Sequence, residues 1–315
     1  MCLILKARES APKRGYFYRS WMMLVNVVAM AKDLELDQHM ELHKLGQSCD
    51  SSNIYDCVCK TRIWLLLYSL EAMIGGPQGT KQFKTSLAFE QLINLKIGRY
   101  DLAVATETID FEPPQGIPGF DETEAQITRQ WTYMCGVVRN IRNSMTLYSK
   151  LHKTKKDWAL DPEFANHDLD FPKWLRELPR DLQIPLPPDG SAPYIPNTFI
   201  ANMHCYHYLS AIMHHRPQIH SLEETADGGN WKQHILTCHD AAKRMCRIQE
   251  SILQNYGLPG LLCMQRGMSF TIYCVLTCTM LHLVRDYGKL YLSKNVANTI
   301  LHITGLNHFS RPRFE

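Results

Sequence analysis

Residues 57–79 read CVCKTRIWLLLYSLEAMIGGPQG, and this stretch decides the fold. From Thr61 to Ile74 the chain is almost wholly apolar around Trp64. The Gly-Gly-Pro that follows ends such a segment, because glycine favours helix termini and proline cannot continue a helix. The stretch therefore predicts a buried helix over 61–74, with the Trp64 ring as an anchor of the core.

Apolar positions at helical spacing recur on both sides of this stretch. Residues 121–153 place them at intervals of three and four, which makes one broad apolar stripe with Arg129, Arg139 and Arg142 largely outside it. No segment shows the alternation expected of a β-strand. We therefore expect an all-α, multi-helix bundle. Its other helices are expected at Trp21–Leu34, Asp121–Lys153, Asn197–His215, Trp231–Tyr256 and from about Leu262 to Val284.

Prolines and glycines mark where these helices should end. The segment Pro172–Pro196 contains further prolines at intervals too short for regular helix, and it predicts an irregular connector. Arg216–Pro217 is expected to stop one helix, and the Gly-Leu-Pro-Gly sequence at 257–260 to stop the next.

The composition is that of an ordinary globular chain. It has 315 residues, of which 45% are hydrophobic and 21% charged, and its net charge of +3 is too small to indicate a nucleic-acid surface. Most of the 11 cysteines fall inside apolar helical runs, where a thiol behaves as a small hydrophobic group. With no secretory leader in the sequence, this usage predicts a reducing compartment inside the cell.

One segment, 268–284, carries no full charge and approaches the length needed to span a bilayer. It contains three threonines, two cysteines and a histidine, which suit a lipid-facing surface poorly. We therefore predict a buried central helix of the bundle here, and no membrane partner.

Two stretches resemble a known family. The Arg-x-Trp helix ending in Gly-Gly-Pro-Gln-Gly within 57–79, and the run Met30–Ala31–Lys32–Asp33–Leu34 before it, are similar to the middle homology region of fungal binuclear zinc-cluster (Zn(II)2Cys6) transcription factors. The resemblance covers roughly residues 6 to 284. It implies an all-α regulatory domain that is not an enzyme and that controls DNA-templated transcription in the nucleus. Its implied partners are DNA, co-regulator proteins and a second copy of the chain.

The sequence departs from that family in three places. The family's zinc cluster needs six cysteines beginning Cys-x2-Cys-x6-Cys, and this spacing does not occur here. We therefore expect zinc and DNA binding only in a missing N-terminal module, with Met1 a misplaced start or the chain a truncated paralogue. Residues 80–98 separate two family-like stretches, and we interpret them as a retained intron, or else as a surface loop. The resemblance ends at Val284, so we expect 1–284 to be the helical domain and 285–315 a divergent, poorly ordered tail.

No candidate site stands out strongly enough to assign catalytic, cofactor-binding or metal-binding residues. The pair Cys57-x-Cys59 lacks the second pair that zinc sites of this spacing use, and the basic run 151–156 also suits a helix C-terminus. The acidic segment 101–112 is expected to be a solvated connector, and Trp131, like Trp64, a core anchor. The best metal candidate is the cluster His204, Cys205, His207, His214 and His215, which packing and capping also explain.

Two functions therefore stay open. The first is the regulatory domain that the resemblance implies. The alternative is a helical small-molecule-binding or enzymatic bundle. Convergent titratable groups lining a pocket would favour the alternative, and an apolar core with only surface histidines would favour the regulatory domain.

Overall fold

The protein is described from a computed structural model, which describes residues 16–48, 53–75, 104–112, 122–152, 154, 157–223, 230–263, 274–275 and 277–279. Within these ranges every regular element is helical, which confirms the prediction of an all-α, multi-helix fold. The elements are α2 (Tyr16–Asp33), α3 (Leu36–Lys44), α4 (Ile54–Gly75), η2 (Thr106–Thr108), α6 (Glu122–Leu151), η3 (Trp158–Leu160), α7 (Pro162–Asp168), α8 (Asp170–Glu177), η4 (Arg180–Leu182), α9 (Thr198–Glu223) and α10 (Trp231–Leu262).

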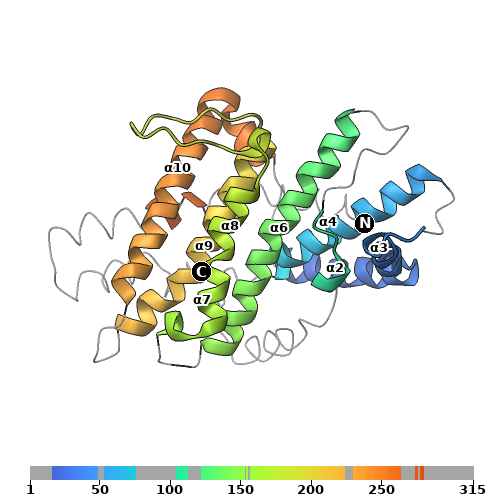
Figure 1. Ribbon diagram of the computed structural model, residues 1–315, viewed down its shortest axis with the longest axis horizontal. Coiled ribbons are helices and arrows are strands. Elements are labelled where there is room, and N and C mark those ends of the chain that lie inside the picture. Colours follow the sequence, from blue (N-terminus) through green and yellow to red (C-terminus); the bar gives the residue numbers. More distant parts are fainter. Residues whose placement is uncertain are drawn as a thin grey trace, which may run out of the picture.

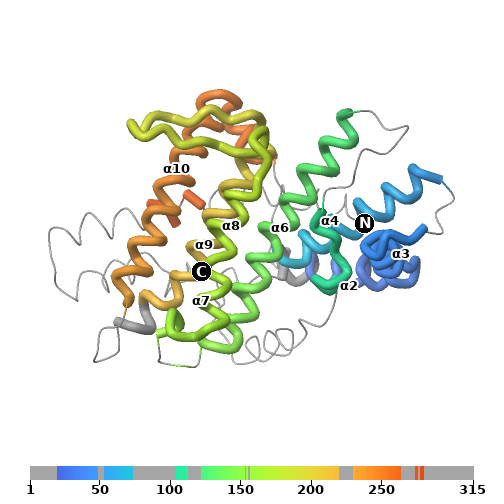
Figure 2. Tube along the Cα trace, viewed as in Figure 1, coloured from blue at the N-terminus to red at the C-terminus, as the bar shows by residue number. Residues whose placement is uncertain are grey.

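Helix α6 lies in the middle of the molecule and separates two groups of helices (Figure 1). On one side, α4 packs against α6, and α2 and α3 pack against α4. On the other side, α9 packs against α6, and α10 lies along α9. The short helices α7 and α8 contact α6 on this second side. Figure 2 shows the same division along the chain, with the blue N-terminal helices and the orange C-terminal helix at opposite ends.

The 57–79 stretch forms the centre of the first group, as its sequence predicts. Helix α4 begins at Ile54, earlier than expected, and the side chains of Trp64, Leu67 and Tyr68 are completely buried. The Trp64 indole donates a hydrogen bond from Nε1 to Oγ1 of Thr108 over 3.0 Å. The ring is therefore both packed and satisfied, which agrees with its predicted role as a core anchor.

The segment 104–112 is not the solvated connector that its acidic composition suggested. Val104, Thr108 and Ile109 are buried, and Lys44 of α3 donates to the backbone oxygen of Glu107 over 2.6 Å. The acidic side chains of Glu107 and Glu112 are exposed, while the apolar residues between them face the core. Charge alone was a poor guide because the apolar positions decide which side of the segment is buried.

Prolines interrupt the helices less than the sequence suggested. Residues 172–177, expected in the connector, belong to α8, where Pro172 lies in the first turn and costs no intrahelical hydrogen bond. Helix α9 continues through Pro217 to Glu223 instead of stopping there. The residues that follow Pro217, Gln218 and Ile219, are buried, and the Gln218 side chain accepts from the backbone nitrogen of Trp158 over 2.7 Å. In α10 the expected break is present: Gly257 has φ 64° and ψ −166°, and one further turn follows it.

The rest of the expected connector, after η4, is irregular as predicted. It is held against α10 by side chains that bind its backbone oxygens. Nη2 of Arg247 lies 2.6 Å from the oxygens of both Pro187 and Ser191, and the Ser251 hydroxyl donates to Pro193 over 2.8 Å. A proline-rich segment has many oxygens that no backbone N–H satisfies, and α10 supplies the donors.

Several predictions fall outside the described residues. These are the insert at 80–98, the tail at 285–315 and most of the uncharged segment 268–284. Of the described residues in that last segment, Cys274, Thr277 and Cys278 are buried, and Val275 and Thr279 are exposed. None of the described helices is both long enough and apolar enough to cross a membrane.

Candidate functional site

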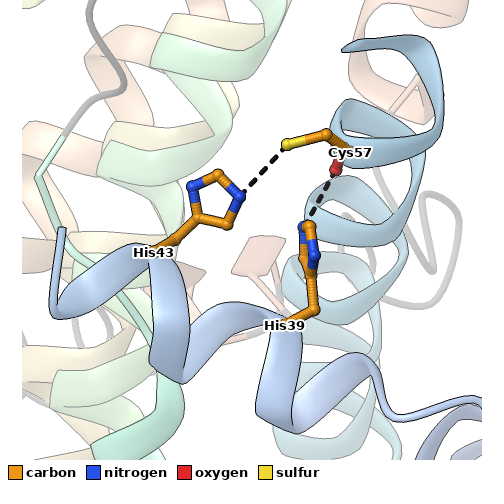
Figure 3. Close-up of side chains that lie close together, drawn as sticks. All are labelled: His39, His43 and Cys57. Carbon is orange, nitrogen blue, oxygen red and sulfur yellow. Dashed lines mark hydrogen bonds between the residues drawn. The ribbon is translucent and has the colours of Figure 1, made fainter. Parts of the chain in front are cut away.

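Three potential metal ligands meet where α3 crosses the start of α4 (Figure 3). His39 and His43 are four residues apart on α3 and therefore lie on one face of it. Cys57 belongs to the first turn of α4. One nitrogen of each imidazole and the sulfur all lie within 4.8 Å of one another. Among the described residues, no other group of three histidine, cysteine or carboxylate side chains comes together in this way.

The three side chains differ in exposure and in partners. His39 is buried, and its Nε2 lies 3.2 Å from the backbone oxygen of Cys57 and 3.3 Å from the Thr61 hydroxyl. Burial, followed by the nearby His43, lowers the pKa of His39 below its ordinary value. His43 is exposed, and its Nε2 lies 3.1 Å from the sulfur of Cys57. The cluster thus has a buried imidazole, His39, on one side and a solvent-exposed imidazole, His43, on the other.

A second and larger cluster of histidines lies between α6 and the C-terminal group of helices. His167 of α7 connects an aspartate to a serine: its Nδ1 is 2.9 Å from Oδ2 of Asp170, and its Nε2 is 3.1 Å from the Ser144 hydroxyl. The same hydroxyl lies 3.3 Å from Nδ1 of His214 on α9. This line of contacts joins α6, α7, α8 and α9.

A parallel line of contacts joins the two longest C-terminal helices to the segment before α7. His215 of α9 lies 2.9 Å from Oδ1 of Asp168 through Nε2, and 2.9 Å from His234 of α10 through Nδ1. The far nitrogen of His234 faces Asp157 at 3.6 Å, which is too long for a hydrogen bond. Burial first and His215 second lower the pKa of His234. Burial alone would raise the pKa of Asp168, but its bond to His215 and the nearby imidazoles lower it.

Several of these imidazoles are packed as neutral aromatic rings. His214 stacks on Phe164 with 3.9 Å between ring centroids, and His207 stacks on Trp174 at 4.7 Å. Burial lowers the pKa of His214 to about 2 and that of His207 to about 3, with neighbouring histidines adding to both shifts. The histidines of this cluster are therefore part of the core and not of the surface.

The Asp170–His167–Ser144 contacts have the order of a hydrolase relay, in which a carboxylate orients an imidazole that activates a hydroxyl. Two features oppose that use. Ser144 is only 7% exposed, so its hydroxyl is enclosed by protein. Nε2 of His167 also lies 3.1 Å from the backbone oxygen of Asn140, which competes with the serine for the same nitrogen. The arrangement links helices through shared hydrogen bonds.

The structure separates the residues that the sequence grouped as a metal candidate. His204 contacts the backbone oxygen of Leu182 at 2.9 Å, and Cys205 is completely buried. His207 stacks on Trp174, and only His214 and His215 join the histidine network. The five therefore do not converge on one point, because a helix turns successive residues to different sides.

The structure also places the other candidate residues of the sequence analysis. Cys57 approaches His43 and not Cys59, which is exposed two residues further along α4. Trp131 is partly buried and packs against Phe199 of α9 at 5.7 Å. Of the basic run 151–156, the three lysines lie outside the described residues.

Sequence reasoning missed His39, His43, His167 and His234. The spacing of His39 and His43, four apart in a helical segment, was the one available signal. The positions of His167 and His234 carried none, because only the packing of distant helices brings them together.

Comparisons with known proteins identify no relative. No family model matches the chain, and no curated protein or solved structure matches it either. The resemblance to fungal zinc-cluster transcription factors therefore stays a prediction from the residues quoted above.

Proposed function

We propose that this chain is a helical regulatory domain similar to the middle homology region of fungal zinc-cluster transcription factors. In this proposal it is not an enzyme, and it controls DNA-templated transcription in the nucleus. DNA and zinc would be bound by an N-terminal module outside this chain. Co-regulator proteins and a second copy of the chain are the partners that such a domain would engage. The step from fold to function rests on analogy with the family.

The observation that carries the proposal is the role of the family-like stretch in the fold. Side chains of α4 hold three elements together. Arg62 forms an ion pair with Glu124 of α6 and donates to the Thr128 hydroxyl over 2.9 Å through Nε. Trp64 donates to Thr108, and Glu71 accepts from the backbone nitrogen of Val104 over 3.2 Å.

A second arginine, Arg142, contacts the C-terminal half of α4. Arg142 of α6 forms an ion pair with Glu71, donates to the backbone oxygen of Val104 over 2.6 Å and lies 4.2 Å from the centre of the Tyr68 ring. Residues that resemble the family thus build the architecture and do not line a reaction centre. This is what an inherited helical scaffold requires, and it supports a regulatory function over a catalytic one.

A tethering experiment tests the proposal. The full chain is fused to an unrelated DNA-binding module, and transcription is measured from a reporter gene carrying its binding site in a fungal host. We expect the fusion to raise or lower reporter transcription relative to the module alone. Trp64→Ala should weaken the effect by destabilising the scaffold, whereas Ile63→Ala, at an exposed neighbouring position, should retain it.

The proposal fails if the folded, nuclear fusion leaves the reporter at the level of the module alone. Equal amounts of fusion protein, measured by immunoblot, are required for the comparison.

The buried histidine cluster favours a second candidate function, a helical small-molecule-binding or enzymatic bundle. Its convergent titratable groups include the Asp170–His167–Ser144 contacts, which an apolar core with only surface histidines would not contain. A fluorophosphonate probe, which reacts with activated serines, separates the two functions. Labelling that disappears in Ser144→Ala would replace the regulatory proposal with a hydrolytic one, and an unlabelled chain would count against the hydrolytic one.

A further inference from the structure

We propose that His39, His43 and Cys57 form a binding site for Zn²⁺ in which water fills the fourth position. The site is independent of the zinc cluster that the resemblance places in another module. It is also independent of the proposed regulatory function, because it rests on the contacts between α3 and α4 alone.

The fold brings the three ligand atoms within 4.8 Å of one another before any metal binds. Histidines four residues apart on a helix present two nitrogens on one face, an arrangement that zinc sites use widely. Helix α4 brings the third ligand to that face, and Nε2 of His43 already lies 3.1 Å from the Cys57 sulfur. Zinc–nitrogen and zinc–sulfur distances in a tetrahedral site would separate those atoms by about 3.5 Å. Binding therefore requires a shift of a few tenths of an ångström at that pair.

The donor set suits zinc. Two imidazoles and one thiolate are ligands that Zn²⁺ prefers, whereas Mg²⁺ and Ca²⁺ prefer oxygen. Zinc binds imidazole in its neutral form, through a ring nitrogen that carries no proton. Cys57 would lose its thiol proton to water as the sulfur–zinc bond forms, with no change of oxidation state.

The surroundings of the ligands also fit a metal site. The backbone oxygen of Cys57 and the Thr61 hydroxyl both lie within hydrogen-bond distance of one His39 nitrogen. Such partners fix the orientation of a ligating imidazole when the other nitrogen holds the metal. His43 is exposed and Cys57 is partly exposed, so solvent reaches this side of the site. No fourth histidine, cysteine or carboxylate joins the group among the described residues, and the proposal gives the remaining position to water.

A bound ion would fasten α3 to α4. Helix α3 otherwise reaches the core through Leu36 and Met40, and it binds the 104–112 segment through Lys44. A ligand that binds only the folded chain raises its stability by mass action. Zinc should therefore stabilise the N-terminal group of helices specifically through this crossing.

Cobalt titration of the full chain tests the site, because Co²⁺ replaces Zn²⁺ and a cobalt–thiolate bond has a charge-transfer absorption in the near ultraviolet. We expect this absorption to saturate at one Co²⁺ per chain and to disappear when Zn²⁺ is added. Cys57→Ser should abolish it. His43→Ala should weaken Co²⁺ binding by at least about 100-fold, more than the loss of a group that only orients a ligand costs.

Matched controls locate the site. Cys59→Ser changes an exposed cysteine two residues away, and His152→Ala changes an exposed histidine outside the group; both variants should titrate like the unmodified chain. Absence of the absorption in the unmodified chain would overturn the proposal, as would its persistence in Cys57→Ser. A loss caused by Cys59→Ser would move the metal to another cysteine and overturn it equally. Circular dichroism of each variant confirms that its helices are intact.

Discussion

The two sides of α6 are held by different chemistry. Toward α4, the polar contacts are arginine–carboxylate pairs, Arg62 with Glu124 and Arg142 with Glu71. Toward the C-terminal helices, the buried polar contacts are made by imidazoles, a serine hydroxyl and aspartates, centred on His167 and His214. The ion pairs of α6 on that side, Arg129 with Asp181 and Lys150 with Glu163, are exposed. We call these the arginine side and the histidine side of α6.

The difference decides how each side responds to pH. A guanidinium stays charged at any pH that a folded protein experiences, so the arginine side keeps its donors. Imidazoles change charge near neutrality, and burial lowers the pKa of four of those on the histidine side, His204, His207, His214 and His234. We infer that acid weakens the histidine side first, because protonating a buried imidazole requires an unfavourable buried charge.

The largest effect is expected from the apolar centre of the arginine side. Trp64→Ala should lower the free energy of unfolding by about 3–5 kcal/mol, because it leaves a cavity and the Thr108 hydroxyl loses its partner. Denaturant unfolding followed by circular dichroism measures the change. Ile63→Ala, on the exposed face of the same helix, is the control and should change stability little. A loss below about 1 kcal/mol for Trp64→Ala would mean that this side does not depend on the ring.

Lowering the pH should destabilise the protein through the histidine side. The pKa values of His214 and His207 are lowered by burial to about 2 and about 3, so the unfolded chain takes up protons that the folded chain does not. Stability is then lost as the pH falls below the unfolded histidine value of about 6.5. For these two groups we expect a loss of about 4 kcal/mol between pH 7 and pH 5.

Other groups add to this change or oppose it. Burial also lowers the pKa values of His204 and His234, and both therefore act in the same direction. Burial raises the pKa of Glu71, so protonation of that carboxyl makes the folded protein more stable as the pH falls. This single contribution is smaller than the sum of the opposing contributions of the buried histidines. Asp168 has a lowered pKa, and its contribution is lost only as the pH falls through the acidic range below the histidine window. Denaturant unfolding between pH 5 and 7 measures the sum, and a stability independent of pH there would contradict the neutral buried imidazoles.

A smaller effect is expected where α8 meets the histidine side. A Cβ atom added to Gly136 would lie 3.0 Å from Nε1 of Trp174, whose indole donates to the backbone oxygen of Tyr133 over 3.2 Å. Gly136→Ala should therefore cost about 1–3 kcal/mol by displacing the indole and its stacking on His207. Thermal unfolding measures the loss. A stability equal to that of the unmodified chain would show that α8 moves freely against α6.

The smallest effect is expected at the protein surface. Arg129 donates to both carboxylate oxygens of Asp181, at 2.5 and 3.0 Å, but the aspartate side chain is 55% exposed. Water competes for both groups, so Asp181→Ala should cost at most about 1 kcal/mol, and less in high salt. A larger loss in denaturant unfolding would show that exposed pairs, and not only the buried Glu71–Arg142 pair, hold this part of the fold.

The sequence predicted the arginine side better than the histidine side. The apolar run around Trp64 and the stripe of residues 121–153 gave α4 and α6, because a continuous apolar face is a local pattern. Arg142 was expected outside the stripe, yet it reaches across to Glu71. A long side chain can satisfy a buried partner from the edge of an apolar face, and the pattern of residues does not reveal this.

The histidine side could not be read from the sequence, because its members are far apart along the chain. Ser144, His167 and His214 belong to three helices, and no spacing predicts their contacts. Proline rules also failed there. Pro172 lies in the first turn of α8, where a missing N–H costs nothing, and α9 continues through Pro217.

The most direct test of the two chemistries compares one variant from each side of α6. The free energy of unfolding is measured against pH, between 5 and 6, for His214→Phe and for Leu67→Ala, which removes a fully buried side chain of α4. His214→Phe keeps a ring against Phe164 but removes a titrating group, so its slope should fall by about 1.2 kcal/mol per pH unit relative to the unmodified chain. Leu67→Ala should lower stability at every pH and leave the slope unchanged. Equal slopes in His214→Phe and the unmodified chain would contradict the account, because His214 would then not be a buried neutral group.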